Sequence, residues 1–128
     1  MTKSPHSERK LINQVRMSKY VIIYGSGMVG ELTCKRLQAH GLGQKIVSFA
    51  VSEGQKDALL DSLLCGFPIQ KIDKLVEYRK TAIIIIATLP NVQAEIEANL
   101  LRLQFENILF VSPKLYRNFF QNYIPDFL

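Results

Sequence analysis

The residues best placed to do chemistry are three glycines near the N-terminus. Tyr20–Tyr24 is an apolar run, and Gly25, Gly27 and Gly30 follow it in a Gly-x-Gly-x-x-Gly pattern. The stretch after Gly27 has the apolar spacing of a helix, so the glycines join an expected strand to an expected helix. Backbone N–H groups at such a helix N-terminus attract negative charge. The segment therefore predicts a bound phosphate or pyrophosphate.

Each glycine has its own expected role. Gly25 makes the tight turn after the strand, Gly27 lets the backbone approach the pyrophosphate, and Gly30 lets the helix pack closely on the strand. The alternative is a glycine turn kept in a fold that no longer binds a ligand. These two interpretations differ in whether valine at position 27 would abolish binding of a nucleotide.

The carboxylate that holds the ribose hydroxyls in NAD-binding proteins is missing from its usual place. It is expected about 20 residues after the glycines, at the end of the second strand. That strand ends at Val51 and Ser52, and Glu53 follows one or two residues late. Glu53 is read first as a solvated turn residue, with contact to the ribose as the alternative. Specificity for NAD is not supported, so the identity of the nucleotide stays open.

A third candidate element follows the most apolar strand. Thr88, Leu89 and Pro90 lie where ligands bind in open α/β sheets, at the carboxyl edge. Thr88 is a candidate hydrogen-bonding partner of the ligand; the alternative is that Thr88 only ends a strand and Pro90 only starts a helix. The predicted nucleotide-binding residues are Gly25, Ser26, Gly27, Met28, Val29, Gly30, Val51, Ser52, Thr88, Leu89 and Pro90.

The sequence contains no recognisable catalytic or metal-binding pattern. Cys34 and Cys65 have neither disulfide-framework nor metal-ligand spacing, and we expect both to be small buried hydrophobes. His40 is expected to be a charge partner at a helix end rather than a general base. Lys45 and Lys56 are expected to be solvated rather than to bind an extra phosphate. No catalytic residue and no metal are predicted, and the chain alone is not expected to be an enzyme.

Strands and helices are expected to alternate along the chain. Strands are predicted at residues 20–24, 45–51, a short piece from 69, 81–88 and 107–111, and helices at 28–40, 58–64, 73–79, from 90, and 114–123. The four isoleucines at 83–86 cannot be amphipathic, so helices should cover both faces of the sheet. We predict a three-layer, Rossmann-like α/β domain with a parallel sheet of about five strands.

Charge and hydropathy limit the classes of partner. The net charge is +5, but the first 19 residues carry five basic residues and one acidic residue, which leaves +1 for the rest. A nucleic-acid partner is therefore not expected. The longest strongly apolar run, Ala82–Ala87, is far shorter than the ~20 residues that span a bilayer. With no signal-peptide pattern, a cytoplasmic location is expected.

The two ends of the chain have different expected roles. Residues 1–18 are expected to be a flexible basic lead-in, with a short helix presenting Leu11, Ile12 and Val15 as the alternative. Residues 19–128 are expected to form the nucleotide-binding domain. The apolar C-terminal segment is expected to cover the sheet, with a homo-oligomer interface as the alternative. Its apolar residues are Leu115, Tyr116, Phe119, Phe120, Tyr123, Ile124, Phe127 and Leu128.

Taken together, these segments resemble the small Rossmann-type domains of bacterial polysaccharide-biosynthesis proteins. Such domains occur in nucleoside-diphosphate-sugar epimerases/dehydratases, initiating glycosyl transferases and sugar acyltransferases. The resemblance covers about residues 19–113, and Val51 and Ser52 depart from it where the family has an acidic pair. The matching pieces are Gly25–Glu31, Ile46–Ser52, Gly66–Ile69, Ile84–Ala87, Glu95–Ile96 with Leu100, Leu101, Gln104 and Phe105, and Phe110–Pro113.

The resemblance implies a non-catalytic nucleotide-binding module of a polysaccharide or sugar-nucleotide biosynthesis protein. Its ligand would be NAD(P) or a nucleoside-diphosphate sugar, with coenzyme A as a further option. One alternative is a part of an NAD(P)-dependent oxidoreductase or sugar-modifying enzyme. Others are a regulatory module, similar to those that gate potassium transport, and an oligomerisation domain with a degenerate phosphate loop.

Overall fold

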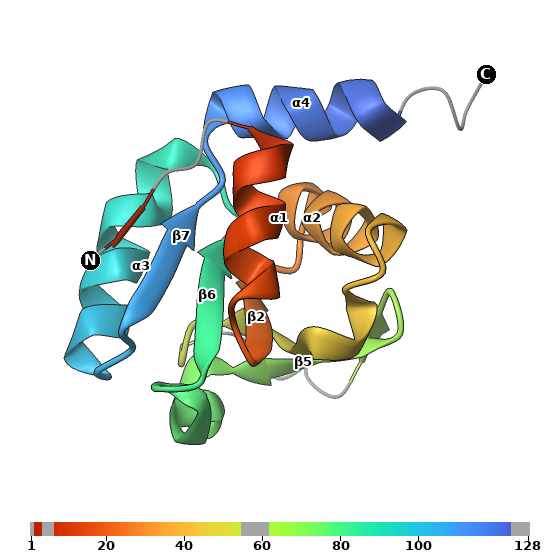
Figure 1. Ribbon diagram of the computed structural model, residues 1–128. Helices are drawn as coiled ribbons and strands as arrows, with labels where there is room; N and C mark the ends of the chain where they lie inside the picture. Colours follow the sequence, from red (N-terminus) through yellow and green to blue (C-terminus); the bar gives the residue numbers. More distant parts are fainter. Residues whose placement is uncertain (1, 4–6, 55–61, 124–128) are drawn as a thin grey trace.

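Seven strands form one sheet in the computed structural model of the chain, which describes residues 2–3, 7–54 and 62–123 (Figure 1). The strands are β1 (Thr2–Lys3), β2 (Tyr20–Tyr24), β3 (Ile46–Val51), β4 (Leu63–Leu64), β5 (Phe67–Lys71), β6 (Ala82–Ile86) and β7 (Asn107–Phe110). The α-helices are α1 (Glu8–Arg16), α2 (Met28–Ala39), α3 (Pro90–Arg102) and α4 (Pro113–Tyr123), and Gly43–Lys45 and Ile72–Tyr78 are 3₁₀-helices.

The order of the strands places β2 at a switch point of the chain. Across the sheet the order is β1-β7-β6-β2-β3-β5-β4, and every pairing is parallel except that of β4 with β5. From β2 the chain builds outward through β3 and β5, then returns to the other side through β6 and β7. In such sheets the ligand site lies beyond the carboxyl ends of the strands at this switch point.

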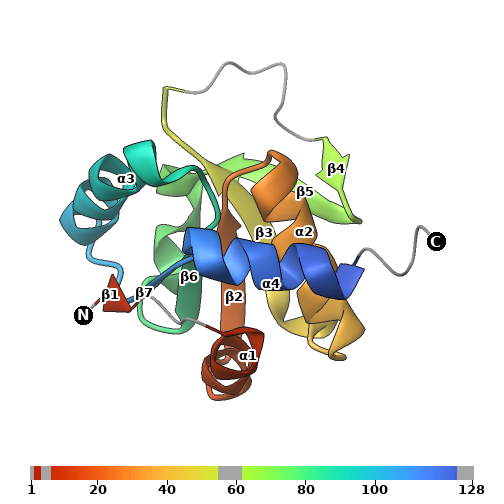
Figure 2. The same cartoon turned by 90° about the horizontal axis from the view of Figure 1, so that it is seen from above.

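Both faces of the sheet are buried, as the isoleucine run predicts. Ile83 and Ile85 pack in a cluster with side chains of α1, α2 and α4, whereas Ile84 and Ile86 pack with side chains of α3 and the second 3₁₀-helix. Figure 2 shows α1 and α3 on opposite sides of the strands. The expected three-layer Rossmann-like α/β fold is therefore confirmed, with two short edge strands beyond the expected five.

The segment between β3 and β5 departs from the expected helix at 58–64. Residues 58–61 lie outside the described residues, but Leu63–Leu64 is a strand that pairs antiparallel with β5. Cys65 and Gly66 form the turn between them with φ of 54° and 88°. Two consecutive residues with positive φ make the type of turn that joins a tight β-hairpin. The helix expected at 73–79 is a 3₁₀-helix that begins at Ile72.

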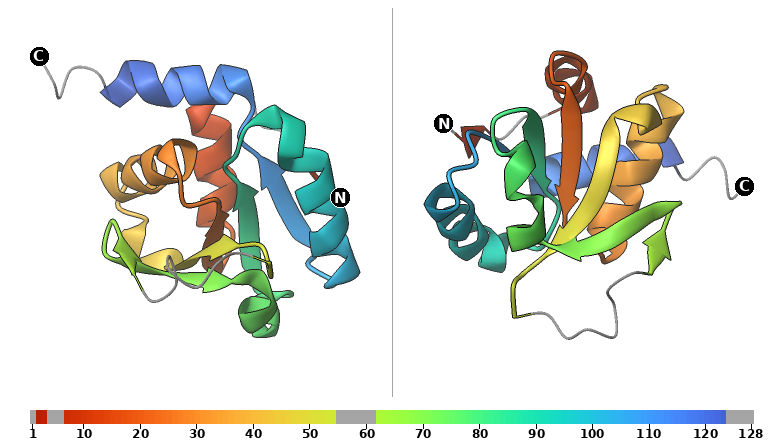
Figure 3. Two further views of the ribbon diagram at one scale, coloured as in Figure 1. Left: turned by 180° about the vertical axis from the view of Figure 1, so that it is seen from behind. Right: turned by 90° about the horizontal axis from the view of Figure 1, so that it is seen from below.

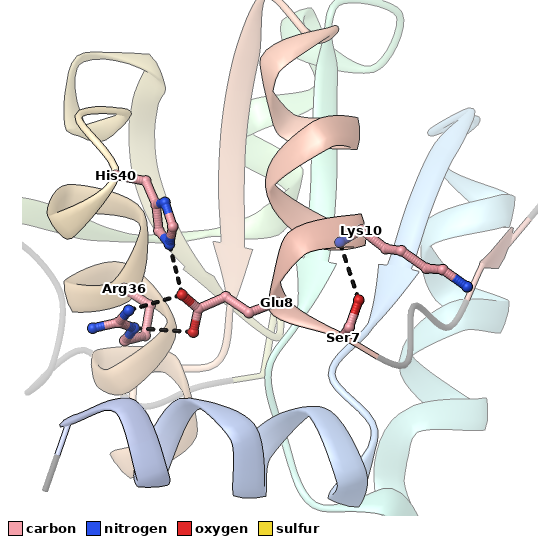
Figure 4. Close-up of polar contacts among 5 residues, drawn as sticks. All are labelled: Ser7, Glu8, Lys10, Arg36 and His40. Carbon is pink, nitrogen blue, oxygen red and sulfur yellow. Dashed lines mark hydrogen bonds and ion pairs between the residues drawn. The ribbon is translucent and has the colours of Figure 1, made fainter.

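The N-terminal helix belongs to the packed body rather than to a loose lead-in. Leu11 and Val15 are fully buried and Ile12 nearly so, which matches the alternative of a short apolar-faced helix. Glu8 joins α1 to α2 through the guanidinium of Arg36, with N–O distances of 3.0 and 2.8 Å (Figure 4). At the other end of α1, the Lys45 ammonium donates to three main-chain carbonyls at 2.7–3.2 Å. Lys45 is thus not a solvated residue, and Lys56 lies outside the described residues.

Helix α4 covers the same face of the sheet as α1 and α2. Leu115 and Phe119 are fully buried, which fits the expected covering role, whereas Phe120 is 47% exposed. Ile124 and the apolar residues after it lie outside the described residues, so the oligomer interface stays a prediction. Among the helices that the structure describes, none is long and apolar enough to cross a membrane.

Candidate functional site

The turn after β2 can only be built with glycine at its first position. Gly25 has φ of 121°, and a Cβ there would lie 2.5 Å from the main-chain oxygen of Ala87. The close approach comes from β6, which is held beside the turn by a hydrogen bond from the Ala87 N–H to the Tyr24 carbonyl, 2.9 Å long. On the other side, the Gly25 N–H donates to the Ala50 carbonyl at 2.9 Å. Neighbouring strands therefore hold the turn from both sides.

Gly30 and Gly27 differ sharply in their surroundings. A Cβ on Gly30 would lie 2.0 Å from the Gly25 carbonyl oxygen, so the first turn of α2 packs directly on the glycine turn. A Cβ on Gly27 would meet no atom within 4 Å. Gly27 is the N-cap of α2 and makes no side-chain capping bond. Gly27 is thus exposed at the start of α2, and no neighbouring atom stands where its side chain would be.

The loops after β2 and β6 touch each other at the switch point. A Cβ on Gly25 would lie 3.0 Å from the Thr88 methyl group. Thr88 is held in place because the Gln93 amide donates to its carbonyl and to that of Val111, at 3.0 and 3.1 Å. Pro90 is in the first turn of α3, and the N-cap Leu89 is 66% exposed. The N-termini of two helices, α2 and α3, therefore follow adjoining loops.

A cleft of about 840 Å³ opens at this edge of the sheet. One wall is α3, and the floor is the ends of β2 and β3 with the loops that follow them. The lining residues are Tyr24, Gly25, Ser26, Val51, Ser52, Glu53, Val92, Glu95, Ile96, Ala98, Asn99 and Arg102. This volume lies within the range of small-molecule and cofactor sites.

An ion pair spans the far end of the cleft. The Arg102 guanidinium lies 3.1 Å from the Glu53 carboxylate and also donates to the Asn99 side-chain oxygen at 2.7 and 3.1 Å. The Arg102 and Glu53 side chains are 61% and 42% exposed, so the pair adds little to stability. Glu53 is thus neither a simple solvated residue nor committed to the ribose, because it contacts α3.

Tyr24 carries its phenol among carboxylates on the floor of the cleft. Burial, with smaller contributions from the charges of Glu53 and Glu95, raises the pKa of Tyr24 to about 12. The phenol is therefore protonated at neutral pH and available as a hydrogen-bond donor. Among the described residues that line the cleft, two carboxylates and one neutral phenol give this end an acidic character, and Arg102 is the single basic side chain.

The structure gathers some of the predicted binding residues and separates others. Of the eleven, Gly25, Ser26, Val51 and Ser52 line the cleft. Val51 does so while its side chain packs in the core with α2, so only its backbone is offered to a ligand. The other seven lie at the adjoining helix N-termini, where Met28 is 72% exposed and its sulfur accepts a hydrogen bond from the Tyr116 hydroxyl at 3.3 Å. Their role in binding stays a prediction.

The α3 wall of the cleft was missed by sequence reasoning. The apolar spacing of Val92, Ile96, Leu100 and Leu103 indicates a single buried face. In the structure Leu100 is buried, whereas Val92 is 37% exposed and lines the cleft with Ile96. A second face of α3, which mixes apolar and polar side chains, is also visible in the sequence. Its residues recur at helical spacing at positions 92, 95, 96, 99 and 102.

Within the described parts of the chain, no group of three or more His, Cys, Asp or Glu side chains is placed to hold a metal ion. Backbone N–H groups at a helix N-terminus can bind an anion without a metal.

Comparison with known proteins identifies the architecture. No protein-family model matches the sequence, and no curated protein matches it. A solved structure of RSP, a Rex-family repressor, matches with a TM-score of 0.60 at 13% identity over 92% of this chain and 66% of that chain. RSP in complex with β-NADH matches with a TM-score of 0.57 at 17% identity over 81% of this chain and 50% of that chain. The chain thus spans about half to two thirds of these proteins.

At such low identity the likeness bears on the fold alone. The resemblance to polysaccharide-biosynthesis domains is upheld at the level of a Rossmann-like fold, and neither matched structure comes from such a protein. The chain is an α/β domain of Rossmann-like architecture with a glycine turn and a cleft at its switch point.

Proposed function

We propose that the chain is a nucleotide-binding regulatory module whose ligand is a nicotinamide dinucleotide of the NAD(H) type. The observation that carries the proposal is the glycine turn, in which Gly25 and Gly30 are fixed by packing while Gly27 faces open space. Backbone packing requires glycine at positions 25 and 30, whereas glycine at position 27 leaves the backbone of the helix N-terminus open to the approach of an anion. The fold likeness to a repressor in complex with β-NADH supports a regulatory rather than a biosynthetic context.

The proposed ligand lies across the switch point in two halves. Its pyrophosphate sits against Gly27 and the N-terminus of α2, where the helix dipole favours negative charge. Its adenosine half enters the cleft, where Val92 and Ile96 of α3 offer apolar contact with the base. A nucleoside-diphosphate sugar would use the same phosphate site, but no observation on the described residues favours it over a dinucleotide.

Ligand binding is the first test. NADH at 100 times its dissociation constant should stabilise the chain by ~2.7 kcal/mol, seen as a rise in Tm. Gly27→Val should weaken binding about 100-fold or more, because the valine side chain fills the space of the phosphate. Isothermal titration calorimetry would give the affinities, with NADPH, coenzyme A and a nucleoside-diphosphate sugar as competing ligands.

Gly54→Val is the matched control. Gly54 also has open space around its Cβ position but does not line the cleft, so this variant should bind like the unaltered chain. No stabilisation by any of the four ligands at millimolar concentration would refute nucleotide binding. Stabilisation by the nucleoside-diphosphate sugar alone would restore the biosynthetic context.

The ribose contact provides a second test. Val51 and Ser52 offer no carboxylate, so we assign the acidic role to Glu53 and Glu95, which lie near the same Tyr24 phenol. A hydrogen bond from a ribose hydroxyl to a carboxylate contributes about 1.5–3 kcal/mol. Glu95→Gln should therefore reduce NADH affinity about 10-fold or more. The ratio of NADH affinity to NADPH affinity should also fall in this variant. In the unaltered chain the carboxylates of Glu53 and Glu95 repel the ribose phosphate of NADPH, and the variant has one carboxylate fewer.

Glu97→Gln supplies the control for this charge change. Glu97 lies on the same helix and is half-buried, but it is absent from the residues that line the cleft. Equal NADH affinity of the Glu95→Gln and Glu97→Gln variants would show that the adenosine half binds elsewhere.

A further inference from the structure

The two cysteines, 31 positions apart in the sequence, come together between α2 and the β4–β5 hairpin. Cys34 lies on α2 and is fully buried, and Cys65 is half-buried at the tip of the hairpin. Cys65 packs against the core cluster that contains Cys34. One turn further along α2, the Gln38 amide donates to the Cys65 carbonyl at 3.4 Å. Figure 3 shows the hairpin, in light green, beside α2, in orange.

The backbone at Cys65 is unusual for its residue type. Its φ of 54° lies in the left-handed region, and Gly66 follows with φ of 88°. Turns of this kind favour Asn, Asp or Gly at the first position, because a Cβ in left-handed conformation costs roughly 1–2 kcal/mol. Cysteine is not among the residues favoured at this position, and the Cys65 thiol contacts the Cys34 thiol of α2. Backbone conformations of this kind cluster at functional positions in proteins.

The surroundings give the two thiols different reactivities. Burial, with a smaller contribution from the neighbouring Cys65, raises the pKa of Cys34 to about 12. Burial also raises the pKa of Cys65, while a hydrogen bond from the Cys34 side chain acts in the opposite direction. Each thiol therefore lies close enough to change the proton affinity of the other. Cys65, which is more exposed and receives the hydrogen bond, is the better nucleophile of the two.

We propose that Cys34 and Cys65 form an oxidisable dithiol that small-molecule disulfides convert into an intramolecular disulfide. The Cys65 thiolate attacks one sulfur of the reagent, the reagent S–S bond breaks, and one reagent thiolate leaves. The Cys34 sulfur then attacks the Cys65 sulfur of the mixed disulfide, and the second reagent thiolate leaves. The chain loses two electrons and two protons, and the reagent disulfide is reduced to two thiols.

The resulting bond would tie the edge hairpin to the helix that begins at the glycine turn. Cys34 lies on α2 and Cys65 in the turn between β4 and β5, and the hydrogen bond from Gln38 already holds these two segments together. The site needs no nucleotide, so its test does not depend on the proposed function. Because burial raises the pKa of both thiols, the first step should be slow at neutral pH and should accelerate as the pH rises.

The experiment uses the full chain and the aromatic disulfide DTNB at pH 8 under native conditions. The unaltered chain should release two equivalents of thionitrobenzoate, and mass spectrometry should find a product lighter by about 2 Da without an adduct. Peptide mapping should join the Cys34 and Cys65 peptides. Cys34→Ala should release one equivalent and retain one reagent group on Cys65.

Cys65→Asn completes the set and keeps the turn, because Asn tolerates positive φ. This variant should fold, as circular dichroism would check, and its buried Cys34 should react at least 10-fold more slowly than the unaltered chain does. A stable mixed disulfide on Cys65 in the unaltered chain would overturn the proposal. Reaction of Cys65→Asn at the rate of the unaltered chain would overturn it as well.

Discussion

Gly30→Ala is expected to destabilise the fold by about 3 kcal/mol or more. The new Cβ would lie 2.0 Å from the Gly25 carbonyl oxygen and 2.9 Å from the Gly25 carbonyl carbon. The contacting atoms are backbone, so no side chain can rotate away. The turn cannot retreat either, because the Gly25 N–H is bonded to Ala50 and Ala87 closes its other side. The gain of roughly 1 kcal/mol that alanine normally brings to a helix is much smaller than this clash.

Gly27→Ala is the matched control, since it adds the same methyl group three residues earlier. Its Cβ meets no atom, and the cost is limited to the weaker N-cap, about 1 kcal/mol or less. Urea unfolding of both variants, followed by circular dichroism, would give the two free energies of unfolding. A Gly30→Ala variant that loses no more stability than Gly27→Ala would mean that α2 readily shifts off the turn. The glycine pattern would then reflect ligand binding at both positions.

Features that follow from the local sequence pattern can be predicted from the sequence alone. The isoleucines of β6 predicted a strand buried on both faces because no amphipathic arrangement fits four apolar residues in succession. The glycine spacing predicted the turn because positive φ and close backbone approach exclude side chains. His40 was expected to be a charge partner at a helix end, and its Nε2 lies 2.6 Å from the Glu8 carboxylate.

Features that depend on contacts between distant segments cannot be predicted from the local sequence pattern. The 31-residue separation of Cys34 and Cys65 carries no signal, because the contact arises only when β5 pairs with β3 and carries the hairpin to α2. Strand β1 is two residues long and has no pattern of its own. Lys45 reads as a surface residue, yet the C-terminus of α1 folds onto it. In each case tertiary packing decides the environment of a residue whose sequence context is neutral.

The ion pair between Glu8 of α1 and Arg36 of α2 leads to the second large effect. We expect Glu8→Ala to lower the free energy of unfolding by about 3 kcal/mol. The Glu8 carboxylate receives two hydrogen bonds from Arg36 and lies against His40, as Figure 4 shows. The Glu8 and Arg36 side chains are only 10% and 15% exposed. Removing one member of a mostly buried pair leaves the other charge poorly solvated, which costs more than an exposed pair contributes.

A double-mutant cycle separates this effect from lost packing. Arg36→Ala and Glu8→Ala should each be strongly destabilising, and the double variant should be more stable than the sum of the two losses predicts by about 2 kcal/mol. Arg9→Ala, an exposed neighbour on α1, should change stability by less than about 0.5 kcal/mol. Additive losses in the cycle would contradict a coupled pair. In that case Leu11 and Val15, the fully buried apolar side chains of α1, would hold the helix on the sheet without help from charge.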